Sequence, residues 1–206
     1  MKILAIGSHP DDIEFGCGGT LAKFSSDGKN RIYLLVMTRG SKGGNPGLRW
    51  REQKLSAKIL GAELYSGDFK DTEIPSARRT ITAIENVIKD ISPDLIFTHF
   101  PEDTHQDHRA TAQGTISSTR YIRNVLFYEV PTTVNFAPAN VFTDIGIFME
   151  KKLRLLKAHK SQVHATRIAG MSILEAAEAT ATFRGYQNRT RYAEAFVPLR
   201  LNLEIF

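Results

Sequence analysis

The sequence predicts an α/β protein with a Rossmann-like three-layer fold, in which helices cover both faces of a mostly parallel sheet. Short apolar runs at 3–6, 32–37 and 95–98 are rich in leucine or β-branched residues and do not alternate with polar residues. Strands that are buried on both faces have this pattern. Segments of helical periodicity separate the runs, and repeating βα units build a parallel sheet.

The helices between these strands have their own boundary signals. We expect one helix over 49–60 and another over 77–91, where Ser76 precedes the second helix and Pro93 ends it. Four isoleucines recur at helical spacing and define the buried face of the second helix: Ile81, Ile84, Ile88 and Ile91. The last third of the chain is less regular. There we expect strands and helices over these ranges: strands 125–130, 141–145 and 196–205, and helices 147–159 and 173–183.

We expect residues 1–206 to form a single domain, because no low-complexity or Pro/Ser-rich linker divides them. No apolar stretch approaches the roughly 20 residues that a membrane span needs. The N-terminus has neither a long apolar region nor a small-residue cleavage site, so we expect a cytoplasmic protein. Compact α/β enzymes of this size often associate, so a homo-oligomer is a candidate assembly, although the sequence does not define the oligomeric state.

Charge and cysteine content exclude several classes of partner and site. The net charge is +5, but the basic residues are spread in short groups without interleaved aromatics, so we expect no nucleic-acid partner. The charge equally suits anionic small substrates. Cys17 is the single cysteine, which excludes an internal disulfide and a multi-cysteine metal site. Any metal must therefore be bound by histidine and carboxylate groups.

The sequence HPDD, residues 9–12, directly follows the first predicted strand. Open α/β sheets bind their ligands at this end of the strands. Adjacent carboxylates repel each other and need a cation or a proton nearby. His9 and Asp12 are three residues apart across a turn that Pro10 helps to fix, so both can face one metal ion. For this motif alone, a surface turn with a capping aspartate is the alternative.

A second cluster, EDTHQDHRAT at 102–111, follows the strand 95–98 in the same way, so both clusters should lie at one edge of the sheet. His105 and His108 share a helix face, while Asp107 projects elsewhere and can accept a ring N–H. Three protein ligands and an open position are typical of catalytic zinc. We therefore predict one zinc ion per chain, with these ligands: His9, Asp12 and His108.

Two titratable groups of the clusters remain without a ligand role. Asp11, next to a ligand, is predicted to take a proton from water as the general base. His105, oriented by Asp107, is predicted to act as an imidazolium that stabilises an oxyanion or protonates a leaving amine.

Four motifs resemble the zinc-dependent LmbE-like, or PIG-L, N-acetylglucosamine deacetylases, in the order of that family: HPDD, GCGGTLAKF, RWREQKLSAKILGAE and HQDHRAT. The resemblance reaches from Lys2 to about Arg109 and implies a Rossmann-like fold. It also implies these roles: His9, Asp12 and His108 as zinc ligands, Asp11 as the base and His105 as the electrophilic or acid histidine.

The same resemblance implies substrate contacts. An arginine in an R-x-x-E helix holds sugar hydroxyls in the family and matches Arg49, and an aspartate after the next strand best matches Asp71. A solvated helix face and a turn residue are the respective alternatives. Many members read HPDDE, whereas here Ile13 follows the aspartates and Glu14 comes one residue later. The role of the family's glutamate is therefore not transferred to this chain.

The segments HKSQ at 159–162 and RGYQNRTRYAEAFVP at 184–198 look similar to bacterial members that deacetylate small glucosamine conjugates, including a malate conjugate. Such a substrate carries carboxylates, and Arg109 is a candidate for a bidentate contact with one of them. A helix-surface residue is the alternative for Arg109. The glycine-rich segment 39–47 suggests a mobile loop over the pocket.

Together these features predict a zinc-dependent hydrolase that removes the N-acetyl group from a small-molecule N-acetylated amino sugar. Two alternatives remain. One is a metal-dependent hydrolase of another amide or ester class with the same ligands. The other is a non-catalytic Rossmann-like module in which the His/Asp cluster holds a structural metal or forms a salt-bridge network.

Overall fold

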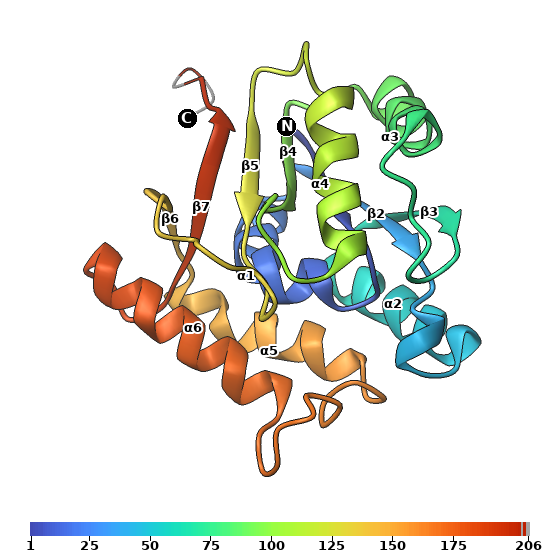
Figure 1. The fold of residues 1–206 in the computed structure, drawn as a ribbon. Coiled ribbons are helices and arrows are strands. Elements are labelled where there is room, and N and C mark those ends of the chain that lie inside the picture. Colours follow the sequence, from blue (N-terminus) through green and yellow to red (C-terminus); the bar gives the residue numbers. More distant parts are fainter. Residues whose placement is uncertain (203, 205–206) are drawn as a thin grey trace.

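A seven-stranded sheet with helices on both faces forms the fold (Figure 1). The computed structural model describes residues 1–202 and 204. The strands are β1 (Lys2–Gly7), β2 (Arg31–Thr38), β3 (Glu63–Phe69), β4 (Leu95–His99), β5 (Val125–Tyr128), β6 (Val141–Asp144) and β7 (Ala193–Arg200). The helices are α1 (Asp12–Ser25), α2 (Pro46–Leu60), α3 (Arg78–Ile91), α4 (Gln106–Ser118), α5 (Met149–Ala158) and α6 (Ile173–Asn188).

The strand order is β3-β2-β1-β4-β5-β7-β6, and the strands from β3 to β5 in this order are parallel. β7 pairs antiparallel with both β5 and β6. This confirms the mostly parallel α/β fold. The chain leaves β1 toward β2 on one side and reaches β4 on the other, so the strand order reverses between β1 and β4. Ligands of open α/β sheets bind in the crevice at such a reversal.

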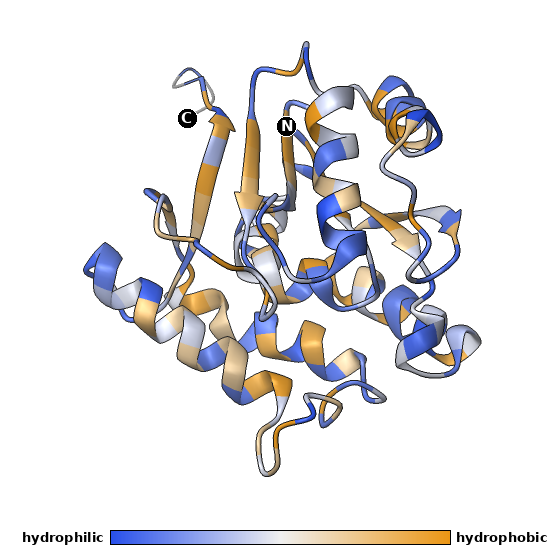
Figure 2. Cartoon of the chain, in the orientation of Figure 1, coloured by the Kyte–Doolittle hydropathy of each residue, from blue (hydrophilic) through white to orange (hydrophobic). Residues whose placement is uncertain are grey.

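The two faces of the sheet bury separate cores. Ile3 and Ala5 of β1 pack on the side of α1, α2 and α5, and Leu4 and Ile6 pack on the side of α3 and α4. Because both faces are covered, the central strands are continuous apolar runs, and Figure 2 shows β5 largely in orange. None of the helices in the described part of the chain is both long and apolar enough to span a bilayer.

Several expected elements differ from the structure at the edges of the sheet. β3 was not predicted, because this edge strand is only half-buried and mixes polar with apolar residues. The closing strand expected over 196–205 begins at Ala193, since β7 pairs with β6 from that residue on, and it ends at Arg200. Positions 203 and 205 of that expectation lie outside the described residues.

Expected helix ends differ as well. The helix expected over 173–183 continues to Asn188 as α6, and a capping box at Ser172 and Glu175 fixes its start. The helix expected over 147–159 begins only at Met149, because a 3₁₀ turn precedes it. Helix ends are the positions that local sequence signals define least sharply.

Helix α1 needs its glycines for close packing beneath the site. A Cβ atom on Gly16 would lie 2.1 Å from Cδ2 of the Tyr128 ring. This ring is fully buried, and its hydroxyl donates a hydrogen bond to the Ile6 carbonyl oxygen at 2.8 Å. The aromatic ring therefore has no freedom to move aside for a side chain at position 16.

We expect Gly16→Ala to lower the free energy of unfolding by about 1–3 kcal/mol, because overpacking displaces the Tyr128 ring. Gly18→Ala in the same helix is the matched control. Its Cβ atom would meet Leu155 at an ordinary 3.6 Å, so the change should be within about 1 kcal/mol. Urea unfolding of both variants measures the difference, and equal stabilities would contradict the packing role of Gly16.

Candidate metal centre

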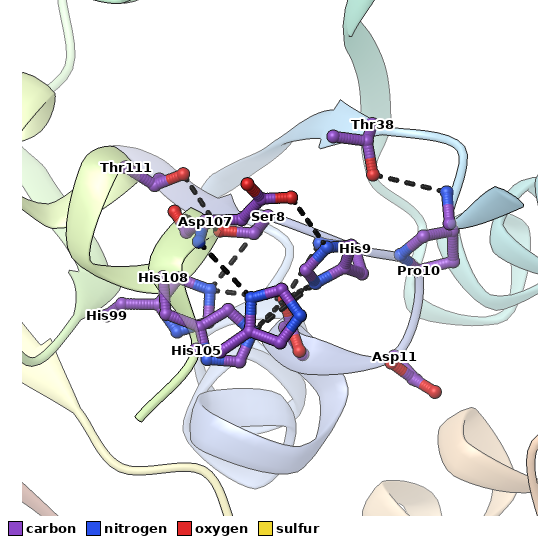
Figure 3. A network of polar contacts seen from close by, with 12 residues as sticks. Ser8, His9, Pro10, Asp11, Thr38, His99, His105, Asp107, His108 and Thr111 are labelled. Atoms are coloured by element: carbon purple, nitrogen blue, oxygen red, sulfur yellow. Dashed lines mark hydrogen bonds and ion pairs between the residues drawn. The ribbon is translucent and has the colours of Figure 1, made fainter. Parts of the chain in front are cut away.

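Polar side chains from two turns meet at the carboxyl ends of β1 and β4 (Figure 3). His9 and Asp12 come from the turn after β1. His99 is the last residue of β4, and His105 and His108 lie at the start of α4. The two motifs that the sequence analysis singled out therefore converge, as expected, at the reversal of strand order.

Three of these side chains form a nearly equilateral triangle of nitrogen and oxygen atoms. His9 Nδ1 lies 3.4 Å from Asp12 Oδ2 and 3.3 Å from His108 Nε2, and the latter two atoms are 3.5 Å apart. A tetrahedral zinc ion with bonds of about 2.0–2.1 Å separates its ligand atoms by about 3.3–3.4 Å. The spacing thus fits a single tetrahedral ion with one open position.

The second nitrogen of His9 faces two carboxylates. His9 Nε2 lies 3.1 Å from Asp71 Oδ1 and 3.2 Å from Asp107 Oδ2. Burial by itself lowers the pKa of His9, but the hydrogen bonds with carboxylates outweigh burial and raise this pKa. A proton on Nε2 leaves Nδ1 free as a metal ligand, which is the usual role of a carboxylate behind a ligating histidine.

The structure differs from the expectation that Asp107 orients His105. The Asp107 carboxylate accepts hydrogen bonds from the backbone N–H groups of Thr72 at 2.7 Å and Ile74 at 3.3 Å, and it contacts His9. The reason is that Asp107, in the first turn of α4, faces the 72–74 segment. Asp71, expected at the sugar, is also buried against His9, and its Oδ2 accepts the backbone N–H of Lys42.

His108 is oriented by residues that the sequence analysis did not identify. Its Nδ1 lies 3.1 Å from Asp103 Oδ2 and 3.1 Å from the Thr132 hydroxyl. Asp103 is buried, and it also accepts the backbone N–H of His105. Both ring nitrogens of His108 are thus used, one by an oxygen partner and one at the triangle. Asp103 precedes His105 and His108 by only a few residues, and this proximity could have identified it from the sequence.

His105 differs from the expected imidazolium. Its Nδ1 accepts a hydrogen bond from the backbone N–H of Asp107 at 3.2 Å, so in the neutral ring the proton lies on Nε2. Burial and then the neighbouring His9 and His108 lower the pKa of His105. The neutral imidazole is therefore the form that the site favours, with an Nε2–H group as a hydrogen-bond donor.

His99 is the functional candidate that the sequence analysis missed. It is fully buried, and its Nε2 lies 3.1 Å from Asp12 Oδ2, so Asp12, His99 and His108 also lie within reach of one ion. Burial, followed by the charge of His108, lowers the pKa of His99 to about 4, which keeps the ring neutral. The sequence feature that could have identified His99 is its position at the carboxyl end of a buried strand, where open α/β sheets bind their ligands.

Asp11 lies beside this cluster in an unusual backbone conformation. Its φ is 97°, and although it stands at the N-cap position of α1, its side chain accepts no capping hydrogen bond. The structure thus contradicts the capping alternative. Non-glycine residues held in sparsely populated backbone conformations concentrate at functional sites. Burial raises the pKa of Asp11 to about 6, the charge of Arg49 lowers it in part, and Asp12 raises it.

Arg49 is buried, which contradicts the alternative of a solvated helix face. Its guanidinium donates hydrogen bonds to the carbonyl oxygens of Gly40 and Pro10 and lies 3.5 Å from Asp11 Oδ2. A Cβ atom on Gly40 or Gly43 would lie within 2.6 Å of this guanidinium. The glycines expected to form a mobile loop thus make room for Arg49, which fixes the turn that carries Asp11.

Glu14 is buried behind the site and connects it to the C-terminal third. Its Oε1 accepts hydrogen bonds from Gln53 at 2.8 Å and Ser56 at 2.7 Å and lies 3.4 Å from His159 Nε2. Nearby, the Glu52 carboxylate accepts hydrogen bonds from the backbone and hydroxyl of Ser161. The HKSQ segment therefore packs against the helices that carry Asp11 and Arg49.

Arg109 is exposed, and its guanidinium donates a hydrogen bond to the carbonyl oxygen of Asp103. Cys17 is buried, and burial raises its pKa well above the usual range of a thiol. Arg109 therefore lies outside the cluster of buried groups, and Cys17 has the environment of a packing residue.

The model of one protein family, described as PIG-L, GlcNAc-PI de-N-acetylase, matches residues 4–119. The chain belongs to the PIG-L family. The matched range includes every residue of the triangle and both residues beside it, Asp11 and His105. The segment after residue 119, which supplies Thr132 and the HKSQ contacts, lies outside this match.

Individual relatives agree with this membership. The chain is 38% identical over 171 residues to an uncharacterized deacetylase, YaiS, of Escherichia coli, covering 77% of this chain and 90% of the relative. It is 32% identical to the diacetylchitobiose deacetylase of Thermococcus kodakarensis, over 78% and 70% of the two chains. The solved structure of the N,N'-diacetylchitobiose deacetylase of Pyrococcus horikoshii superposes with a TM-score of 0.81 at 25% identity, over 100% of this chain and 88% of that chain.

We expect Asp107→Asn to weaken zinc binding about 10- to 100-fold, because an amide cannot act as the carboxylate partner of the His9 ring. Asp68→Asn is the control, since Asp68 is exposed and asparagine tolerates its φ of 54°. Zinc competition against a chromophoric chelator measures both affinities, with circular dichroism to verify folding. Equal affinities in the two folded variants would contradict the orienting role of Asp107.

Proposed function

We propose that the protein is a zinc-dependent hydrolase that removes the N-acetyl group from an N-acetylglucosamine-type conjugate. The observation that carries the proposal is the arrangement of His9, Asp12 and His108 at tetrahedral spacing, with two further titratable groups beside it. A purely structural metal site would need only the ligands. Membership of the PIG-L family and the deacetylase names of the relatives support the choice of an N-acetylated amino sugar as substrate.

Zinc bound by His9, Asp12 and His108 would supply Lewis-acid activation of water and of the substrate carbonyl. Asp11 accepts the proton of the attacking water as the general base. Arg49 contributes by fixing the Pro10–Asp11 turn, which keeps the base beside the triangle. The strained backbone of Asp11 is consistent with this role, since no capping bond explains it.

His105 acts on the carbonyl oxygen of the substrate amide. Its Nε2–H donates a hydrogen bond to the carbonyl oxygen, on which negative charge develops as water adds. The leaving amine takes its proton from Asp11, which holds the proton that it accepted from the attacking water. Arg49 and Asp71 are proposed to contact sugar hydroxyls in addition to the protein groups that they already contact, as the family resemblance implies. The exposed Arg109 is proposed to contact a carboxylate where the conjugate carries one.

We expect Asp11→Asn to reduce kcat/KM by about 10²- to 10⁴-fold while zinc content and folding stay unchanged. Asparagine is the appropriate replacement, because it tolerates a positive φ better than alanine and keeps the shape of the side chain. Steady-state amine release and metal analysis of the purified variant give the two values. Full activity would remove the base assignment, whereas loss of stability without loss of turnover per folded molecule would favour the non-catalytic alternative.

A direct test of the function uses zinc-loaded protein and N-acetylglucosamine conjugates whose aglycones are neutral, phosphate-bearing or carboxylate-bearing. We expect release of free amine and acetate from at least the neutral conjugate, since the proposed chemistry involves only the amide. Parallel phosphoester and ester substrates test the alternative hydrolase classes. Turnover of these substrates, with none of the N-acetyl sugars, would overturn the deacetylase proposal.

A further inference from the structure

We propose that a pocket between Asp11 and the 162–176 segment binds an uncharged, apolar aglycone of the substrate. This inference rests on the proposed function and narrows its substrate class. The pocket has a volume of about 170 Å³. Six of its nine lining residues are apolar: Pro131, Ala165, Ile168, Met171, Ile173 and Ala176. The other three are Asp11, Gln162 and Thr166.

Asp11 connects the pocket to the chemistry. Because the proposed base is part of the pocket wall, a group bound there lies next to the amide that Asp11 serves. None of the lining residues is basic, so the pocket offers no partner to a carboxylate or a phosphate. An apolar wall with a few polar groups is the usual character of a small-molecule site.

The apolar wall is open to solvent and is held in place by local hydrogen bonds. Ile168 is 58% exposed and Met171 is 41% exposed, although both are large apolar side chains. The Thr166 hydroxyl donates to the carbonyl oxygen of Met171 at 2.8 Å and accepts the backbone N–H of Ile168 at 3.2 Å. Exposed apolar side chains grouped in a hydrogen-bonded loop mark a binding surface better than single exposed residues do.

The pocket suits the aglycone better than the acyl group for two reasons. Its volume exceeds that of an acetyl methyl group several-fold, and a cavity of about 150 Å³ already accepts a benzene ring. In addition, apart from Asp11, all lining residues lie after residue 119, outside the range that matches the family model. The reacting groups lie within that range, whereas the pocket is formed, apart from Asp11, by residues that the family model does not match.

The test compares methyl, hexyl and phenyl glycosides of N-acetylglucosamine, together with the methyl glycoside of N-hexanoylglucosamine. We expect kcat/KM to be at least tenfold higher for the hexyl or phenyl glycoside than for the methyl glycoside. Ile168→Asn should reduce this preference at least fivefold, mainly through a higher KM for the hexyl and phenyl glycosides. Ile147→Asn is the matched control, because Ile147 is 89% exposed and does not line the pocket.

A binding measurement separates this inference from the proposed function. Methyl-¹³C methionine labelling reports on Met171 in the pocket and on Met37 and Met149 in the core. We expect the hexyl glycoside, but not the methyl glycoside, to shift the Met171 signal, which Met171→Leu identifies. If the hexyl glycoside shifts the Met171 signal but no glycoside is turned over, the deacetylase function is overturned and the pocket is retained.

Two results would overturn the pocket proposal while the function stands. One is turnover of all glycosides at equal kcat/KM with an unchanged Met171 signal. The other is preference for the N-hexanoyl substrate over the hexyl glycoside, which would assign the pocket to the acyl group.

Discussion

The structure depends on burying several titratable groups together at the reversal of strand order between β1 and β4. His9, Asp12 and His108 approach one another within 3.5 Å in a largely buried setting. Such a cluster is unfavourable unless each polar atom has a partner. The ring nitrogens that face away from the triangle contact Asp71, Asp107 and Asp103, and these carboxylates accept backbone N–H groups in turn.

The carboxylates behind the triangle, Asp71, Asp103 and Asp107, hold the segments around the site in their observed conformations by accepting backbone N–H groups. The 72–74 segment follows β3 and donates two backbone N–H groups to Asp107. The loop after β2 donates the Lys42 N–H to Asp71. Segments that follow two different strands, β2 and β3, thus donate backbone N–H groups to the two carboxylates behind His9. A metal ion bound at the triangle would be held by side chains whose ring orientation is already determined by the fold.

The part of the chain after residue 119 contributes differently to the site. It supplies no member of the triangle, but Thr132 contacts His108 and the HKSQ segment packs behind Asp11 through Glu52 and Glu14. The same part forms the apolar wall next to Asp11. The division is chemically reasonable, because bond cleavage needs fixed polar groups at the sheet edge, whereas recognition of the rest of a substrate needs a surface of its own.

The sequence by itself determined the central strands, the order of the site motifs and the residues of the triangle. Continuous apolar runs identify strands buried on both faces, and the motifs HPDD and HQDH follow two of these strands directly. Only the tertiary structure determined which side chains contact one another in the site. Asp107 faces His9 and not His105, Arg49 is buried against Asp11, and His99 joins the cluster, because these contacts join residues far apart along the chain. The edge strand β3 and the ends of α6 and β7 depended equally on their neighbours in space, since weak local patterns acquire their structure from the elements against which they pack.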